Sequence, residues 1–181
     1  MTTRTKKAPA KTLESTAQAK KVAAKPKKGA AKASVRPLVA DDLETVIRID
    51  EANVGRSRRG FLEKRLAAVK RDPKMFLALA VEDGGALAGF LIARIFRGEF
   101  GTSEPVASID ALGVDGSRQG HGYGSALIAG LEELMRKKGI REVMSQDLWS
   151  SASVMRFLAA SGFELAPRWV LERRLDEPID F

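Results

Sequence analysis

The sequence predicts a mixed α/β domain with a central, mostly antiparallel sheet flanked by helices, in the order β-α-α-β-β-β-α-β-α-β-β. Three observations predict this class. Apolar runs of strand length alternate with stretches of helical periodicity. Two of the runs are joined by the acidic-glycine turn at 82–85, which is typical of a hairpin. A glycine-rich loop at 119–125 separates an apolar strand from the longest helical pattern.

The expected elements follow in order. The domain begins near Ser34 with a strand over 35–38, and Asp41 is the expected cap of the first helix. A polar linker at 53–60, rich in arginine, leads to a second helix that ends at Asp72-Pro73. The later elements are strands at 75–81, 86–95, 106–114, 141–148, from 162 and at 168–175, and helices at 122–138 and 151–160.

Composition excludes several classes of site. The 181 residues suffice for one domain with a sizeable core and a tail. The chain has no cysteine and one histidine, so a disulfide framework, a thiol nucleophile and a multi-histidine metal cluster are excluded, and no metal site is predicted. No apolar run approaches the roughly 20 residues that cross a bilayer, and none lies near the N-terminus. We therefore expect a cytoplasmic protein with no membrane association.

The positive charge is concentrated in residues 1–33, which are rich in Lys, Ala and Pro. This segment holds ten Lys/Arg and one acid, Glu14, of the 31 basic and 23 acidic residues in the whole chain. It therefore carries a charge of +9, and residues 34–181 carry −1. Because it has almost no large apolar side chain, we expect a disordered basic tail before a folded domain at 34–181. The tail is either a solvated extension or an electrostatic attachment to nucleic acid.

The stretch Arg118–Leu127 predicts a phosphate site. Glycines at 120, 122 and 124 follow an apolar strand and precede a helix. A helix N-terminus offers free N–H groups, and glycine lets the backbone approach an anion closely. The spacing excludes a P-loop, since no Lys-Ser/Thr pair follows, and it excludes the dinucleotide fingerprint, whose third glycine would fall on Ser125.

The pattern Gln119-x-x-Gly122-x-Gly124 resembles the Gln/Arg-x-x-Gly-x-Gly/Ala loop of the GNAT-type N-acetyltransferases. Residues 109–114 are similar to the strand before that loop in the family, and residues 151–163 are similar to its last helix and the Gly-Phe that follows. The resemblance extends over residues 34–175 by element order and implies a GNAT-like fold for the 34–181 domain.

The resemblance implies transfer of an acetyl group from acetyl-CoA, the co-substrate, to a primary amine by direct attack in a ternary complex. The loop backbone would hold the pyrophosphate, residues 112–114 would pair with the pantetheine arm, and an N–H there would polarise the thioester carbonyl. The implied cofactor-binding residues are Leu112, Gly113, Val114, Arg118, Gln119, Gly120, His121, Gly122, Tyr123, Gly124, Ser125 and Ser151.

Asp110 is the first candidate for the group that accepts the amine proton. It interrupts an apolar strand, and alternation places it on the face of Leu112 and Val114. The alternative is a structural, hydrogen-bonded Asp110. Glu99 and Glu104 are weaker candidates. His121 is expected to face solvent or a phosphate oxygen rather than to act in catalysis.

The chain departs from the family at the position of the tyrosine that protonates the departing thiolate, which is Leu158 here. The asparagine that often begins that helix corresponds to Ser151. Either the thiolate leaves without a dedicated acid, since a thiol pKa is only about 8.5, or Ser150, Ser151 or Ser153 relays a proton through water.

An alternative function is a nucleic-acid-associated protein that uses its basic tail, with the domain as an acyl-CoA sensor or scaffold. The tail would then place the protein at the nucleoid or ribosome. The acceptor stays open among a small amine, an antibiotic, a protein lysine and a protein N-terminus, and a homodimer also stays open.

Overall fold

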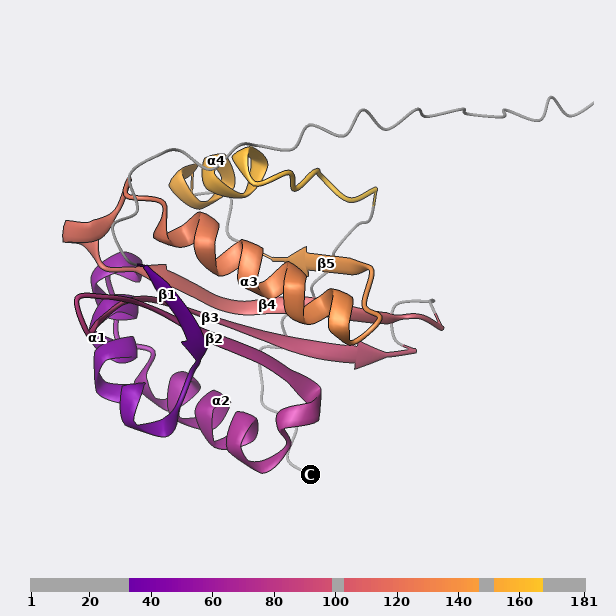
Figure 1. Ribbon diagram of the computed structural model, residues 1–181, viewed down its shortest axis with the longest axis horizontal. Coiled ribbons are helices and arrows are strands. Elements are labelled where there is room, and N and C mark those ends of the chain that lie inside the picture. The colour runs from indigo at the N-terminus through magenta and orange to yellow at the C-terminus, as the bar shows by residue number, and fades with distance from the viewer. Residues whose placement is uncertain (1–32, 99–102, 147–151, 168–181) are drawn as a thin grey trace, which may run out of the picture.

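The computed structural model describes residues 33–98, 103–146 and 152–167 (Figure 1). Most of the expected tail at 1–33, the expected last strand at 168–175, Glu99 and the serines at 150 and 151 lie outside the described residues. Within the described ranges, no helix is both long and apolar enough to cross a bilayer.

In the described part of the chain, five strands form one sheet in the sequential order β1-β2-β3-β4-β5. The first four are antiparallel, and β5 pairs with β4 in parallel. The bounds are β1 Ser34–Pro37, β2 Phe76–Asp83, β3 Ala86–Arg97, β4 Pro105–Val114 and β5 Glu142–Ser145. The predicted hairpin is confirmed: Gly84 and Gly85, with φ of 60° and 80°, turn the chain between β2 and β3.

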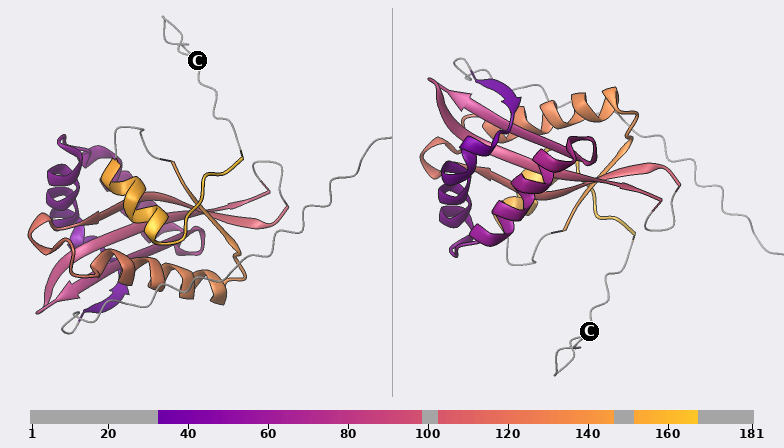
Figure 2. Two further views of the ribbon diagram at one scale, coloured as in Figure 1. Left: turned by 90° about the horizontal axis from the view of Figure 1, so that it is seen from above. Right: turned by 90° about the horizontal axis from the view of Figure 1, so that it is seen from below.

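The helices cover both faces of this sheet (Figure 2). One face carries α1 (Leu43–Val54) and α2 (Arg59–Arg71), and the other carries α3 (Tyr123–Lys137), with α4 (Ala152–Ala160) beside it. Three short 3-10 turns complete the described elements, η1 at Ala40–Asp42, η2 at Pro73–Met75 and η3 at Gly116–Arg118. The mixed α/β fold with a flanked, mostly antiparallel sheet is therefore confirmed.

The sheet separates two hydrophobic cores, one packed against α3 (the α3 core) and one packed against α1 and α2 (the α1/α2 core), and β3 contributes side chains to both. Phe90 and Ile92 point to the α1/α2 core, whereas Leu91, Ala93 and Ile95 point to the α3 core. A strand that is covered on both faces needs apolar side chains at consecutive positions, which is why this run lacks polar alternation. Each fully buried side chain of this size contributes about 1.5–3 kcal/mol of transfer free energy.

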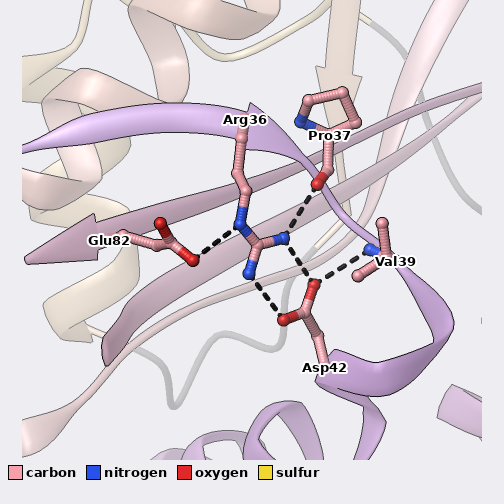
Figure 3. A network of polar contacts seen from close by, with 5 residues as sticks. All are labelled: Arg36, Pro37, Val39, Asp42 and Glu82. Atoms are coloured by element: carbon pink, nitrogen blue, oxygen red, sulfur yellow. Dashed lines mark hydrogen bonds and ion pairs between the residues drawn. The ribbon is translucent and has the colours of Figure 1, made fainter. Parts of the chain in front are cut away.

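An ion-pair network fixes β1 to the start of α1 (Figure 3). Two nitrogens of Arg36 donate to the carboxylate of Asp42 at 2.7 Å each, and its Nε donates to Glu82 at 2.7 Å. Asp42 also accepts the N–H of Val39 at 2.9 Å. Burial raises the pKa of Asp42, but the bonds from Arg36 and Val39 outweigh it and lower the pKa overall. The residue that holds this junction is thus Asp42 and not the expected Asp41.

The C-terminal part differs from expectation in two places. β5 covers Glu142–Ser145, whereas the sequence predicts a strand over 141–148; residues 141 and 146 are not in the strand, and 147 and 148 lie outside the described residues. No strand begins at residue 162 within the described residues: Gly162, with φ 88°, ends the turn after α4, and 163–167 are irregular. The Gly-Phe pair here closes the helix through hydrogen bonds from Gly162 and Phe163 back into α4.

Candidate active site

The strand β4 has an open edge at its C-terminal end. β5 pairs with β4 only from Val106 to Ile109, and no described strand lies on that side of residues 110–114. The N–H of Asp115 donates to Ala88 of β3 at 2.8 Å. Since backbone groups of an antiparallel strand alternate in direction, Leu112 and Val114 direct their N–H and C=O groups to the open side, and Gly113 directs its own to β3. Backbone suited to pair with an extended amide ligand is therefore present.

The glycine loop lies directly beyond this edge and is exposed. Gly120 and Gly122 have φ of 79° and 87°, a region that side chains disfavour. Gly122 is the N-cap of α3 and makes no side-chain capping bond, so the first-turn N–H groups of this 15-residue helix are not covered by a cap. Exposed first-turn amides with the positive end of the helix dipole form an anion site.

Two amide side chains tie this loop to β4 and α1. Gln119 donates from Nε2 to Asn53 Oδ1 at 3.1 Å and to the carbonyl of Val114 at 3.3 Å. Asn53 donates from Nδ2 to the same carbonyl at 3.1 Å. The Val114 carbonyl is thus occupied by the protein. Among the described residues, no partner is seen for the N–H of Val114 or for the backbone groups of Leu112 on the open side. The side chain of Gln119 therefore ties the loop to α1 and β4.

Three other loop side chains turn toward the protein. Arg118 donates to the carbonyl of Asp83 at 3.1 Å and lies 3.6 Å from its carboxylate. His121 Nδ1 lies 2.9 Å from the carbonyl of Gln119, so that nitrogen is assigned as the donor. Tyr123 is buried in the α3 core, and its hydrogen bond to Asp83 raises its pKa. The loop therefore presents main chain to an anion, and Tyr123 serves as a packing residue.

The helix α4 packs on the first turn of α3. A Cβ on Gly124 would lie 2.9 Å from Cε2 of Phe157, so glycine is needed at 124 for this contact. The neighbouring Leu158, where the resemblance leads one to expect tyrosine, is buried at 5% exposure. Ser153 is exposed at the start of α4, and Ser151 lies outside the described residues. The described part of α4 offers no acid at position 158.

Asp110 is the extra residue of a β-bulge. Ile92 pairs with Ala111 and Ala93 pairs with Ile109, which leaves Asp110 without a partner on β3. Ile109 packs in the α3 core and Ala111 in the α1/α2 core, although residues two apart on a regular strand share a face. The bulge therefore shifts the inward and outward alternation of side chains by one residue. The expected placement of Asp110 on the face of Leu112 and Val114 is wrong: it lies with Arg65 on the α2 side.

The carboxylate of Asp110 is 9% exposed and sits among cations. Its Oδ2 lies 2.8 Å from Nε of Arg65, and Arg94 of β3 is near enough to act on its pKa. Burial raises the pKa of Asp110, and the charges of Arg65 and Arg94 oppose that rise without cancelling it. A carboxylate with a raised pKa beside an open strand edge can accept a proton. Glu104 is exposed at the opposite end of β4 from the loop, far from this arrangement.

The sequence analysis missed Arg65 and Arg94. Both carry the signal that singled out Asp110, a charge at a position that should be buried. Arg65 follows Leu62 by three residues and Phe61 by four, on the packed side of α2. Arg94 continues the alternation of Phe90 and Ile92 toward the α1/α2 face. No group of three or more potential metal ligands occurs in the described ranges.

Comparison with known proteins agrees with this geometry. Residues 42–163 match the model of the Acetyltransferase (GNAT) family. A mycothiol acetyltransferase of Clavibacter michiganensis subsp. michiganensis is 38% identical over 89 residues, which is 49% of this chain and 26% of that protein. The chain thus spans about a quarter of the length of that curated relative.

Two solved structures share the fold. A transcriptional regulator from Bacillus halodurans C-125 superposes with a TM-score of 0.68 at 18% identity, over 80% of this chain and 100% of its own. The structure of AAC(6')-Iy in complex with the bisubstrate analogue CoA-S-monomethyl-acetylneamine superposes with a TM-score of 0.64 at 21% identity, over 80% and 99%. With the family match covering most of the described residues, the chain belongs to the GNAT acetyltransferase family.

Proposed function

We propose that the protein is an acetyl-CoA-dependent N-acetyltransferase that transfers the acetyl group to a primary amine by direct attack in a ternary complex. The observation that carries the proposal is the adjacency of two uncommitted backbone surfaces, the first turn of α3 behind Gly122 and the open edge of β4 at Leu112 and Val114. One suits a diphosphate and the other suits the amides of a pantetheine arm.

The residues present fit such a co-substrate, which supplies an activated thioester. The amides from Gln119 to Ser125 hold the diphosphate, helped by the dipole of α3. Leu112 and Val114 align the arm along β4, and an N–H at this edge polarises the thioester carbonyl. Arg118, held by Asp83, stabilises the loop and adds positive potential beside it.

The chain's contribution to the chemical step is proton transfer at Asp110. The amine nitrogen forms a bond to the carbonyl carbon while the carbon–sulfur bond breaks, and the proton of the amine passes to Asp110 directly or through one water. The charge of Arg65 favours the ionised form of this carboxylate, because it opposes the burial that raises the pKa of Asp110. The thiolate leaves without a protein acid at position 158, which a thiol pKa of about 8.5 permits.

Two measurements test this function. Acetyl-CoA at millimolar concentration should raise the melting temperature of the intact protein by mass action. Release of coenzyme A, followed with a thiol reagent, should then depend on an added amine, in a panel of amino acids, peptide N-termini and aminoglycosides. Asp110→Asn should reduce turnover strongly and leave the thermal shift in place. A folded protein that shows neither stabilisation nor amine-dependent release contradicts the proposal.

A second role for the N-terminal segment is favoured by its charge alone, +9 over residues 1–33. We propose that this segment holds the enzyme on nucleic acid in the cytoplasm, where it concentrates the domain near its acceptor. Full-length protein should elute from immobilised DNA at higher salt than a chain lacking residues 1–33. Equal elution of the two forms contradicts this role and leaves the acetyltransferase proposal intact.

A further inference from the structure

Buried polar atoms that lack a hydrogen bond are concentrated at one place. In the described part of the chain three such side-chain atoms occur, Nε of Arg65, Nε of Arg94 and Oδ2 of Asp110. Arg65 and Asp110 are in ionic contact at 2.8 Å, but without the alignment of a hydrogen bond. Folded proteins satisfy nearly all buried polar groups, so a cluster of exceptions calls for an explanation, and a bound ligand is one such explanation.

The charges of this cluster do not balance. Arg58, the neighbouring arginine on the same face, forms a two-bond ion pair with the buried carboxylate of Asp50. Arg65 is paired with Asp110. Among the described residues no carboxylate forms an ion pair with Arg94. Within the part of the chain that the structure describes, Arg94 is therefore a half-buried positive charge without an ion-pair partner, and desolvation makes such a charge costly.

Aromatic rings hold the three guanidinium groups in place. The ring of Phe61 contacts the guanidinium groups of both Arg58 and Arg65, with centroid distances of 5.3 and 5.1 Å. The guanidinium of Arg94 stacks over Phe96 at 4.3 Å. A guanidinium that is held by its face keeps its edge donors in a fixed plane, which suits the two oxygens of a carboxylate or a phosphate.

The cluster also lies where the acceptor has to approach. Asp110 immediately precedes Ala111 and Leu112, where the open edge of β4 begins. The bulge turns the Asp110 side chain toward α2 and Arg94, away from the α3 core on which Leu112 packs. An amine that attacks at this edge and transfers its proton to Asp110 therefore arrives on the face that carries Arg94.

We propose that the acceptor is a primary amine that also carries an anionic group, a carboxylate or a phosphate, and that Arg94 binds this group. The inference rests on the proposed acetyltransferase function and names the substrate class of the same site. Asp110 attracts the amine and Arg94 attracts the acid, so the pair complements a zwitterion. Arg94 is thus a specificity-determining residue.

A neutral amine of the same shape leaves Arg94 uncompensated and binds more weakly. Hydrogen bonds to charged groups contribute about 1.5–3 kcal/mol, which is a preference of about 10- to 150-fold for the anionic member of a matched pair. Arg94→Gln should remove this preference, because glutamine keeps most of the volume and lacks the charge. Arg94→Lys should restore part of it, since lysine keeps the charge without the planar fork.

The test uses matched amines on the full chain. Each acid is compared with its neutral partner: glycine and glycinamide, β-alanine and β-alaninamide, O-phosphoethanolamine and ethanolamine, glucosamine 6-phosphate and glucosamine. The readout is kcat/KM from coenzyme A release at saturating acetyl-CoA, so the carboxylate and phosphate arms are separated. The amine of an amino acid amide is less basic than that of the amino acid, so a larger fraction of it is unprotonated and nucleophilic at neutral pH. Intrinsic reactivity therefore favours the neutral partner, and a preference for the acid has to come from the protein.

The expected result is that at least one anionic series is preferred about tenfold or more by the wild type and that Arg94→Gln abolishes this preference. The preference is the ratio of kcat/KM within each matched pair, so an effect of Arg94 on the pKa of Asp110 cancels. Arg97→Gln, an exposed arginine on the same strand, is the matched control and should leave the preference unchanged. Equal or greater activity with neutral amines in the wild type overturns the inference, as does an equal loss on both classes in Arg94→Gln. Turnover with neutral amines alone contradicts this inference and is still consistent with the proposed function. Lack of acetyl-CoA binding contradicts both.

Discussion

Gly124 and Phe157 meet so closely that a Cβ built on the glycine would lie 2.9 Å from Cε2 and 3.0 Å from Cζ of the ring. The first residue belongs to the opening turn of α3 and the second to α4, which are separated by β5 in the sequence. The contact therefore links the proposed phosphate site to the C-terminal part of the fold. It also explains one glycine of the loop by packing, since Gly124 lies within the helix.

Gly124→Ala should destabilise the fold. The added methyl group forces the Phe157 ring or α4 to move, and overpacking of this kind costs about 1–3 kcal/mol. Urea unfolding measures the loss, and Phe157→Leu in the same chain should recover most of it. Gly116→Ala, where a Cβ would meet nothing within 4 Å, is the control and should be close to neutral. A Gly124→Ala chain as stable as the wild type would show that α4 does not sit as described.

In the Arg36 network, loss of the Asp42 carboxylate should lower the free energy of unfolding more than loss of the Glu82 carboxylate. Asp42→Asn removes a carboxylate that receives two bonds from Arg36 and one from Val39, and should cost about 1–3 kcal/mol. Glu82→Gln removes one bond at a more exposed site and should cost about 0–1 kcal/mol. Equilibrium unfolding of both variants at neutral pH checks the order, and a larger loss for Glu82→Gln would contradict it.

The same network predicts a pH dependence. The pKa of Asp42 is lower in the folded chain than its ordinary value, so its contribution is present above that ordinary value and is lost as the pH falls through the folded pKa. The stability difference between wild type and Asp42→Asn should therefore shrink below about pH 4. Unfolding midpoints measured from neutral to acid pH test this, and a difference that grows in acid would refute it.

Arg65 should set the acid limb of the activity profile. Its charge opposes the burial that raises the pKa of Asp110, so Arg65→Gln should raise that pKa further. Asp110 then takes up its proton at a higher pH, and the acid limb of kcat/KM against pH moves upward. The variant Arg97→Gln serves as control. A limb that stays fixed or moves to lower pH would show that Asp110 is not the base.

The helices and strands that form the layers of the fold could be predicted from the sequence, because each of them depends on the periodicity and turn residues of its own segment. The hairpin at 82–85 and the helix after Gly122 need only turn chemistry and periodicity, and both are confirmed. The exposed glycine loop followed from spacing in the same way. The short β5 was misjudged because its length is set by where β4 and β5 separate, a property of the pairing and not of the strand alone.

The bulge at Asp110 could not be predicted from its own strand. Residues 108–114 read as a regular alternation, and the extra residue becomes visible only in the register with β3. The bulge changes which residues surround the candidate base, because it places the carboxylate on the face of Arg65 and Arg94 instead of the α3 face. The charges themselves were visible in the sequence, but their meeting depends on the packing of α2 against the sheet.

The most direct test is calorimetric titration of acetyl-CoA into three forms of the full chain. Gly122 and Gly139 flank opposite ends of α3 with φ of 87° and 71°, and neither has a heavy atom within 4 Å of a built Cβ. Alanine at either site therefore imposes similar backbone strain, but only Gly122 lies in the loop. The wild type and Gly139→Ala should bind with equal affinity and Gly122→Ala at least about tenfold more weakly, a loss of about 1.4 kcal/mol. Equal binding by all three forms, or none by the folded wild type, would contradict the assignment of these amides to the diphosphate.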